Sequence, residues 1–188
     1  MQAVHTAAQG AGGAGIELHT KANCSARFDW IHALGDNQNM PRIFCIANQK
    51  GGVGKTTTTV NLAAGLAQLG QRVLVIDLDP QGNATMGSGV DKRSLELTVY
   101  DVLLESATIA EARKKSESSG YDVLGANREL AGAEVELVSV ERRSERLRGA
   151  LTAIENDYDF VLIDCPPALS LLTLNGLVSA HGVIVPMQ

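Results

Sequence analysis

The stretch Asn48–Thr59 constrains the fold of this chain more than any other feature. It reads Asn-Gln-Lys-Gly-Gly-Val-Gly-Lys-Thr-Thr-Thr-Thr, and it joins a short apolar run, residues 43–47, to a run with helical periodicity. An apolar run of that length is typical of a strand buried on both faces of a parallel sheet. Glycines lack Cβ atoms, so a glycine-rich backbone can curl tightly and point successive N–H groups at one anion. The stretch therefore predicts a phosphate-binding loop between a strand and a helix.

Two side chains after the last glycine supply the chemistry that a nucleotide requires. Lys55 can reach the outer phosphates with its ammonium group, and Thr56 offers a hydroxyl to Mg²⁺. The positive end of the following helix dipole adds to the attraction. The alternative is a glycine-rich turn with two solvated lysines. We expect nucleotide contacts from Lys50, Gly51, Gly52, Val53, Gly54, Lys55, Thr56 and Thr57.

The segments around this loop predict an α/β fold. The helical pattern Lys55–Leu69 ends at Gly70, and a second apolar strand follows at residues 72–76. Strand, loop, helix and strand within about 35 residues form a βαβ unit, which gives parallel strands. Further strands are expected at 121–125, 160–164 and 182–186, and further helices at 99–104, 109–115, 141–154 and 169–180. The expected fold is a doubly wound, parallel-sheet P-loop NTPase domain over residues 40–188.

The two ends of the chain carry separate expectations. Residues 1–39 are rich in Ala, Gly and Gln and have no sustained hydrophobic period, so we expect a disordered extension there. The last predicted strand has no following helix. We therefore expect a sheet that is incomplete at its C-terminal edge, in a truncated chain.

Composition limits the partners. Hydrophobic residues make up 45% and charged residues 20% of the chain, as in ordinary soluble proteins, so we expect a cytoplasmic protein. The net charge of -5 gives no overall electrostatic reason to bind nucleic acid. The cysteines Cys24, Cys45 and Cys165 are far apart in sequence and odd in number, which favours neither a disulfide framework nor a zinc site. No run approaches the roughly 18 apolar residues of a membrane span.

Carboxylates follow two of the predicted strands. Asp77 and Asp79 come after the second strand, and Asp164 ends the strand at 160–164. Ligands of an open parallel sheet bind outside the carboxyl ends of its strands, so these side chains should converge on the glycine loop. P-loop enzymes hold Mg²⁺ through such an aspartate, which predicts that Asp164 acts with Thr56. The alternative is that these aspartates only cap the next turn.

Hydrolysis also needs a group that orients water. Many P-loop ATPases have a glutamate directly after the strand-end aspartate, but this chain has Cys165, which cannot act as such a base. Asp79 is the best-placed candidate for that duty.

These motifs resemble those of the ParA/MinD family of deviant Walker A ATPases. Residues 50–57 read Lys-Gly-Gly-Val-Gly-Lys-Thr-Thr, with Gln49 where the usual P-loop has a glycine, and residues 77–85 resemble the ParA version of the second family motif. The likeness covers residues 41–188. It implies an ATP-dependent switch in chromosome or plasmid partition that binds and slowly hydrolyses Mg-ATP.

The resemblance also implies roles for single residues and for partners. Lys50 would reach across a nucleotide-sandwich dimer, Asp77 would support the magnesium network, and Asp79 would position the attacking water. The catalytic set is then Lys50, Lys55 and Asp79, and the metal set is Thr56, Asp77 and Asp164. A homodimer, a ParB-type partner and non-specific DNA of the nucleoid are the implied partners of the full-length protein. Adenine contacts would lie beyond Gln188.

Three alternatives remain open. A MinD-like cell-division regulator would bind membrane, although the Asp-Pro-Gln-Gly-Asn wording at residues 79–83 favours ParA. An iron–sulfur carrier would need cluster-ligating cysteines, for which Cys165 alone is poor support. A truncated, non-catalytic fragment would bind nucleotide weakly or not at all.

Overall fold

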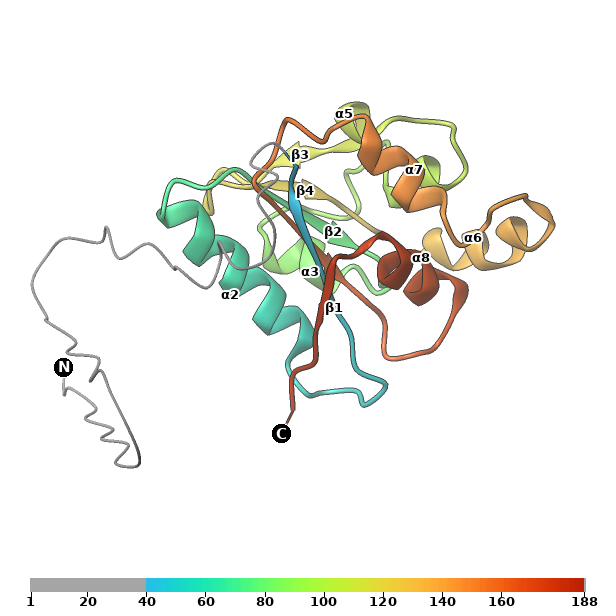
Figure 1. The fold of residues 1–188 in the computed structure, drawn as a ribbon, viewed down its shortest axis with the longest axis horizontal. Helices are drawn as coiled ribbons and strands as arrows, with labels where there is room; N and C mark the ends of the chain where they lie inside the picture. The colour runs from blue at the N-terminus through green and yellow to red at the C-terminus, as the bar shows by residue number, and fades with distance from the viewer. Residues whose placement is uncertain (1–39, 188) are drawn as a thin grey trace, which may run out of the picture. The chain divides into compact units, whose positions relative to one another are not determined.

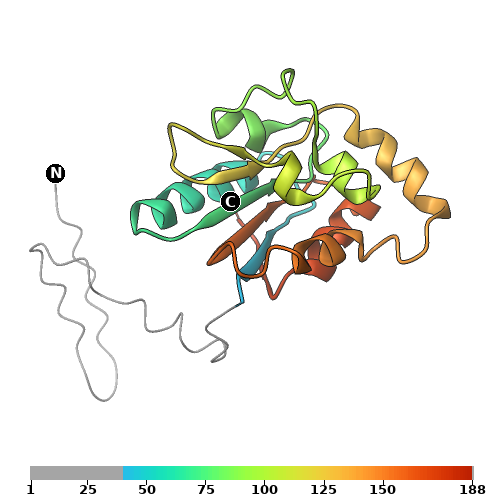
Figure 2. The ribbon, with the colours of Figure 1, turned by 90° about the horizontal axis from the view of Figure 1, so that it is seen from above.

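The computed structural model describes residues 40–187, which form a six-stranded sheet between layers of helices (Figures 1 and 2). Figure 1 shows α2 on one side of the sheet and α7 and α8 on the other. The strand order is β3-β4-β2-β5-β1-β6, and only the short edge strand β3 runs antiparallel to its neighbour. The expected parallel-sheet α/β fold is confirmed.

The elements follow one another in the alternating order of a doubly wound fold. They are β1 (Arg42–Ile46), α2 (Lys55–Gln68), β2 (Val73–Asp77), α3 (Asn83–Gly87), α4 (Val99–Leu103), α5 (Ile109–Ala112), β3 (Lys114–Lys115), β4 (Asp122–Leu124), α6 (Leu130–Glu136), the 3₁₀ turn η1 (Leu137–Ser139), α7 (Arg146–Thr152), β5 (Phe160–Asp164), α8 (Leu171–Ser179) and β6 (Gly182–Ile184).

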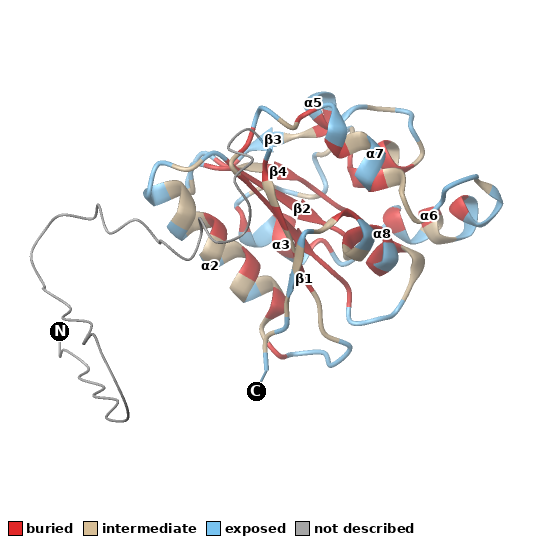
Figure 3. Ribbon diagram, in the orientation of Figure 1, coloured by how far each residue is buried: buried red, intermediate tan, exposed pale blue. Residues whose placement is uncertain are grey.

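The core lies on both faces of the central strands. Every residue of β2 and β5 is buried, and the red strands at the centre of Figure 3 show this burial. The two strands of the βαβ unit predicted around α2 are not adjacent in the sheet, because β5 lies between β1 and β2 and pairs with both. Helix α8 comes close to this layer at Gly176, where an added Cβ would lie 2.8 Å from Cys165 Sγ and 3.2 Å from Leu78 Cδ1.

Two predicted helices are shorter than expected. The helix at 109–115 ends at Ala112, because Arg113 is extended and the next two residues pair with β4. The helix at 141–154 begins only at Arg146, because Arg142 has a left-handed backbone with φ 52°. Helices α3 and α6 were not predicted at all. The expectation for residues 1–39 lies outside the described residues.

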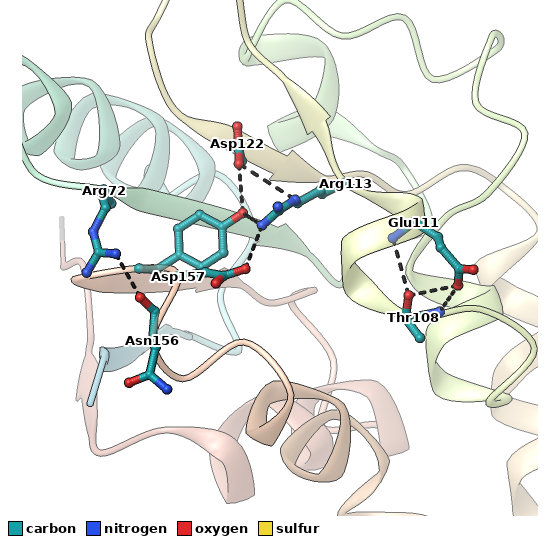
Figure 4. A network of polar contacts seen from close by, with 8 residues as sticks. Arg72, Thr108, Glu111, Arg113, Asp122, Asn156 and Asp157 are labelled. Atoms are coloured by element: carbon teal, nitrogen blue, oxygen red, sulfur yellow. Dashed lines mark hydrogen bonds and ion pairs between the residues drawn. The ribbon is translucent and has the colours of Figure 1, made fainter. Parts of the chain in front are cut away.

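A polar network joins the beginnings of β2, β4 and β5, at the edge of the sheet opposite the glycine loop. Figure 4 shows Arg113 between Asp122 and Asp157, with Arg72 and Asn156 nearby. The guanidinium of Arg113 donates to Asp157 at 3.1 Å and to the Tyr158 hydroxyl at 2.7 Å. That hydroxyl donates in turn to Asp122 at 2.7 Å, and burial together with Asp122 raises the pKa of Tyr158, so it stays protonated.

We expect Tyr158→Phe to lower the free energy of unfolding by about 1–3 kcal/mol, because the partly buried Asp122 loses its hydroxyl donor. Urea unfolding followed by circular dichroism measures the effect. Tyr100→Phe is the matched control, since its hydroxyl donates to Glu136 at an exposed position, and it should change stability by less than about 0.5 kcal/mol. Equal effects of the two variants would contradict a structural role for the network.

Candidate functional site

Three central strands end at one level and bring the predicted site together. In the parallel register, Asp164 at the end of β5 pairs with Ile46 of β1 on one side and with Asp77 of β2 on the other. The loops that follow these strands therefore begin side by side. The predicted convergence of the glycine loop and the strand-end carboxylates is confirmed.

The glycine loop has the backbone that an anion site requires. Gly52 and Gly54 have φ values of +76° and +86°, which side chains rarely adopt, so glycine suits both positions. A Cβ added at Gly51, Gly52 or Gly54 would meet nothing within 4 Å, so the space in front of the loop is open. Helix α2 starts after Gly54 without a side-chain cap, which leaves N–H groups of its first turn available to a ligand.

The flank of the loop is fixed by Asn48. Its side-chain oxygen accepts from the Lys50 amide at 2.9 Å, and its side-chain nitrogen donates to the Pro186 carbonyl, just past β6, at 2.8 Å. The loop is thus tied to the neighbouring strand as well as to its own. Lys50 itself is exposed at the entrance to the loop.

Lys55 lies over the loop rather than in solvent. Its side chain is buried, and Nζ donates to the Lys50 carbonyl at 3.2 Å across the turn. A phosphate that enters the loop can replace this carbonyl as the acceptor. Outside the loop, an open hollow is lined by Gly52, Gly54, Thr57, Thr58, Asn61 and Leu62. Val53 is buried, so its backbone rather than its side chain can face a ligand.

Asp164 is held by two hydroxyls of α2. Thr56 Oγ1 donates to Oδ2 at 2.7 Å, which is the pair expected from sequence, and Thr59 Oγ1 donates to Oδ1 at 3.1 Å. Burial raises the pKa of Asp164 to about 6, although the two threonine hydrogen bonds oppose the shift and the nearby Asp79 adds to it. Sequence reasoning missed Thr59. Thr59 lies three residues after Thr56, and residues at that spacing share one face of a helix, so the sequence did indicate that both could face Asp164.

Asp77 and Asp79 differ in what they face. Asp77 is fully buried, and its oxygens accept from the Asp79 amide at 3.1 Å and from the amide and hydroxyl of Thr85 at 2.8 and 2.7 Å. Within residues 40–187 these donors all come from its own loop, so its place in the magnesium network stays a prediction. Asp79 is half-buried, and one carboxylate oxygen accepts from the Gln81 amide at 2.9 Å.

The residues present fit a magnesium nucleotide. The hydroxyl of Thr56 and the carboxylate of Asp164 are the hard oxygen ligands that Mg²⁺ prefers, and Lys55 and the open loop suit phosphate. The described part of the chain holds no group of three or more His, Cys, Asp or Glu side chains arranged for a metal. This donor set suits an ion that shares its ligands with nucleotide phosphates.

Two cysteines that are far apart in the sequence meet below the loop. Cys45 of β1 and Cys165, the residue after β5, are buried free thiols with their sulfur atoms 3.2 Å apart. The hydrogen bond with Cys45 and burial raise the pKa of Cys165, which keeps it a neutral thiol. Sequence separation could not predict this contact, because it depends on β5 lying next to β1.

Known proteins are similar to this chain in sequence and in fold. Residues 41–188 match a family model described as an AAA domain. The sporulation initiation inhibitor protein Soj of Bacillus subtilis is 50% identical over 149 residues, which are 79% of this chain and 59% of Soj. The chromosome partitioning protein ParA of Caulobacter vibrioides is 51% identical over 152 residues, 80% of this chain and 57% of that protein. The chain thus spans less than two thirds of either relative.

Among solved structures, one from Mycobacterium smegmatis superposes with a TM-score of 0.77 at 47% identity, covering 79% of this chain and 60% of that one. It is described as cobyrinic acid a,c-diamide synthase with bound ADP and magnesium. In residues 40–187, no helix has the length and apolar character needed to cross a bilayer.

The buried Asp77 predicts a pH dependence of stability. Burial raises its pKa from the ordinary 3.8 to about 7, so between these values the folded state keeps a proton that the unfolded chain releases. The free energy of unfolding should therefore fall as the pH rises through this window, by up to about 1.4 kcal/mol per pH unit from this group. Asp77→Asn should flatten the slope by that amount, whatever its effect on absolute stability.

Urea unfolding at pH 5, 6, 7 and 8 measures the slope. Asp91→Asn, at an exposed aspartate, is the control and should leave the slope unchanged. A slope that is the same in Asp77→Asn and the wild type would contradict a pKa of Asp77 that burial raises in the folded state.

Proposed function

The chain belongs to the AAA-domain family, and from that premise we propose that it is an ATP-dependent switch of the ParA type that acts in chromosome or plasmid partition. The observation that carries the proposal is the 2.7 Å hydrogen bond from Thr56 to Asp164 beside the open glycine loop. This pair joins the two halves of a P-loop magnesium site. The names of Soj and ParA, at 50% and 51% identity, support the ParA type.

ATP binds through the loop. Backbone N–H groups of residues 51–54 and of the first turn of α2 face the phosphates, and Lys55 turns from the Lys50 carbonyl to the outer phosphates. Thr56 and Asp164 would hold Mg²⁺ between them, since their oxygens already lie within hydrogen-bond distance of one another. Bound magnesium supplies positive charge against the phosphates. The ADP and magnesium named in the Mycobacterium smegmatis structure support both ligands.

Hydrolysis is assigned to Asp79. Its carboxylate lies near enough to Asp164 to raise the pKa of that residue, and Cys165 is a neutral thiol that cannot accept a proton there. Asp79 orients the attacking water and so holds it in line with the outer phosphate. The rate of this step sets how long the ATP-bound state of the switch lasts.

Lys50 is the residue that we assign to the contact with a second copy of the chain. Its side chain is exposed at the loop entrance, while Lys55 already covers the loop from within the same chain. By the resemblance to the ParA/MinD family, we infer that Lys50 reaches the phosphates of a second copy in an ATP-bound homodimer, and its exposure is compatible with that role. A ParB-type partner, non-specific DNA and a cytoplasmic, nucleoid-associated location complete the proposal for the full-length protein. They rest on the resemblance to the ParA/MinD family, which the names of Soj and ParA support.

One solved relative favours a second candidate, an ATP-dependent synthase, because of the name of the Mycobacterium smegmatis structure at 47% identity. A synthase would consume ATP only with a second substrate present. Hydrolysis that responds to a ParB-type protein without any such substrate supports the partition switch.

We expect Lys55→Ala to abolish ATP binding, because the loop loses the ammonium that lies over it. Lys50→Ala should keep monomer affinity within about 3-fold of the wild type, which is less than 1 kcal/mol, but prevent the ATP-dependent dimer. Fluorescent-nucleotide titration and sedimentation measure the two effects. Lys114→Ala, at an exposed lysine of β3, is the control. Wild-type affinity in Lys55→Ala, or normal dimers in Lys50→Ala, would contradict the respective role.

The two aspartates should separate binding from turnover. In the full-length protein, Asp79→Ala should bind Mg-ATP normally and slow single-turnover hydrolysis by about 10² to 10⁴ under partner stimulation, since it loses the group that orients water. Asp164→Ala should weaken magnesium-dependent ATP affinity, since Thr56 loses its carboxylate partner. The opposite pattern, with binding lost in Asp79→Ala and kept in Asp164→Ala, would reverse the two assignments.

A further inference from the structure

The carboxylate of Asp77 has a set of partners that the proposed mechanism does not use. It is fully buried at the end of β2, and its three hydrogen-bond donors belong to Asp79 and Thr85 of the loop that follows. The metal-site hydroxyl of Thr56 donates instead to Asp164. The hydrogen bonds of Asp77 therefore close the segment between Asp77 and Thr85.

Thr85 extends this contact to a neighbouring strand. It is fully buried in α3, and its hydroxyl donates to Asp77 while it accepts from the Ala126 amide, just past β4, at 2.9 Å. The packing around it is tight, because a Cβ on Gly125 would lie 3.0 Å from Thr85 Cγ2. The hydroxyl of Thr85 thus joins the ends of β2 and β4.

The same strand end also holds the middle of the loop. Gly82 has φ +62°, and a Cβ there would lie 2.6 Å from the Ala126 carbonyl oxygen, so the loop passes the segment just after β4 at backbone distance. Glycine is required at this crossing for both reasons. The loop from Asp77 to Thr85 is consequently fixed against β4 at two points.

Asp79 is the residue that this closure orients. Its amide donates to Asp77, and its carbonyl accepts from the Gly82 amide at 2.8 Å. Its carboxylate accepts from Gln81 at 2.9 Å. Both backbone groups of Asp79 and one of its carboxylate oxygens are therefore held by hydrogen bonds within the loop.

We propose that Thr85 is a positioning residue for Asp79, which acts through Asp77 and fixes the loop against the end of β4. The inference rests on the proposed function in one respect, the role of Asp79 in orienting water. A misplacement of about 1 Å in a catalytic group can cost about 10²-fold in rate. The Thr85 hydroxyl therefore affects turnover without touching nucleotide.

Thr85→Val tests this, because valine keeps the shape of threonine and removes the hydroxyl. In the full-length protein we expect hydrolysis to slow by about 10- to 100-fold, while Mg-ATP affinity stays within about 3-fold. Amide hydrogen exchange of residues 78–84 and of Ala126 should become faster. Thr85→Ser keeps the hydroxyl and should restore hydrolysis to within about 3-fold of the wild type.

Ser88→Ala is the matched control. It removes a buried hydroxyl at the C-terminal end of α3 that bonds to Ala84 and Tyr121 but not to Asp77. It should leave both turnover and the exchange of residues 78–84 unchanged. This comparison separates a general loss of packing from the loss of the Asp77 contact.

Three results would overturn the inference. Wild-type turnover in Thr85→Val, or unchanged exchange of residues 78–84, would show that the hydroxyl does not set the loop. A loss of magnesium-dependent affinity as large as the loss of rate would place Asp77 in the metal site instead. Failure of the proposed function is a different result, since the wild type itself would then neither bind nor hydrolyse ATP. In that case the exchange measurement would still test whether the Thr85 hydroxyl holds the loop closed.

Discussion

Two carboxylates buried side by side at the ends of central strands are the constraint on which this structure depends. Asp77 and Asp164 are partners in the parallel register of β2 and β5, and burial raises the pKa of both. A buried carboxylate must find donors, because each oxygen left without a partner costs about 1–3 kcal/mol. Asp164 accepts from two threonine hydroxyls of α2, and Asp77 accepts from the hydroxyl and amide of Thr85 in α3 and from the amide of Asp79. The need to satisfy these charges therefore fixes how both helices meet the sheet.

The arrangement places the chemistry on rigid elements. Helix α2 carries Lys55 and Thr56 at its first turn, and the loop that holds Asp79 is closed between β2 and α3. The space in front of the loop glycines is open. Lys55 and Thr56 thus belong to one helix, whereas Asp79 belongs to the loop that leads into another. Such a division lets binding and turnover respond to different substitutions.

Local pattern was enough to predict most of the fold and much of the candidate site. The strand at 160–164 and the helix after the glycine loop were predicted almost to the residue, because burial on both faces and helical periodicity are local signals. The Thr85 bridge and the Cys45–Cys165 contact were missed, because both depend on strand order rather than on neighbours in sequence. The late start of α7 follows from one left-handed residue, Arg142, which no periodicity reveals.

The close approach of α8 at Gly176 limits how this site can vary. A single methyl group there would meet the sulfur of Cys165 at 2.8 Å and side chains of two neighbouring segments at 3.2 and 3.3 Å. Any larger residue would have to lift the helix from the backbone that follows Asp164. Substitutions in this outer helix are therefore coupled to the geometry of the sheet edge that carries Asp164, and position 176 should tolerate almost no replacement although it lies outside the glycine loop and the strand ends.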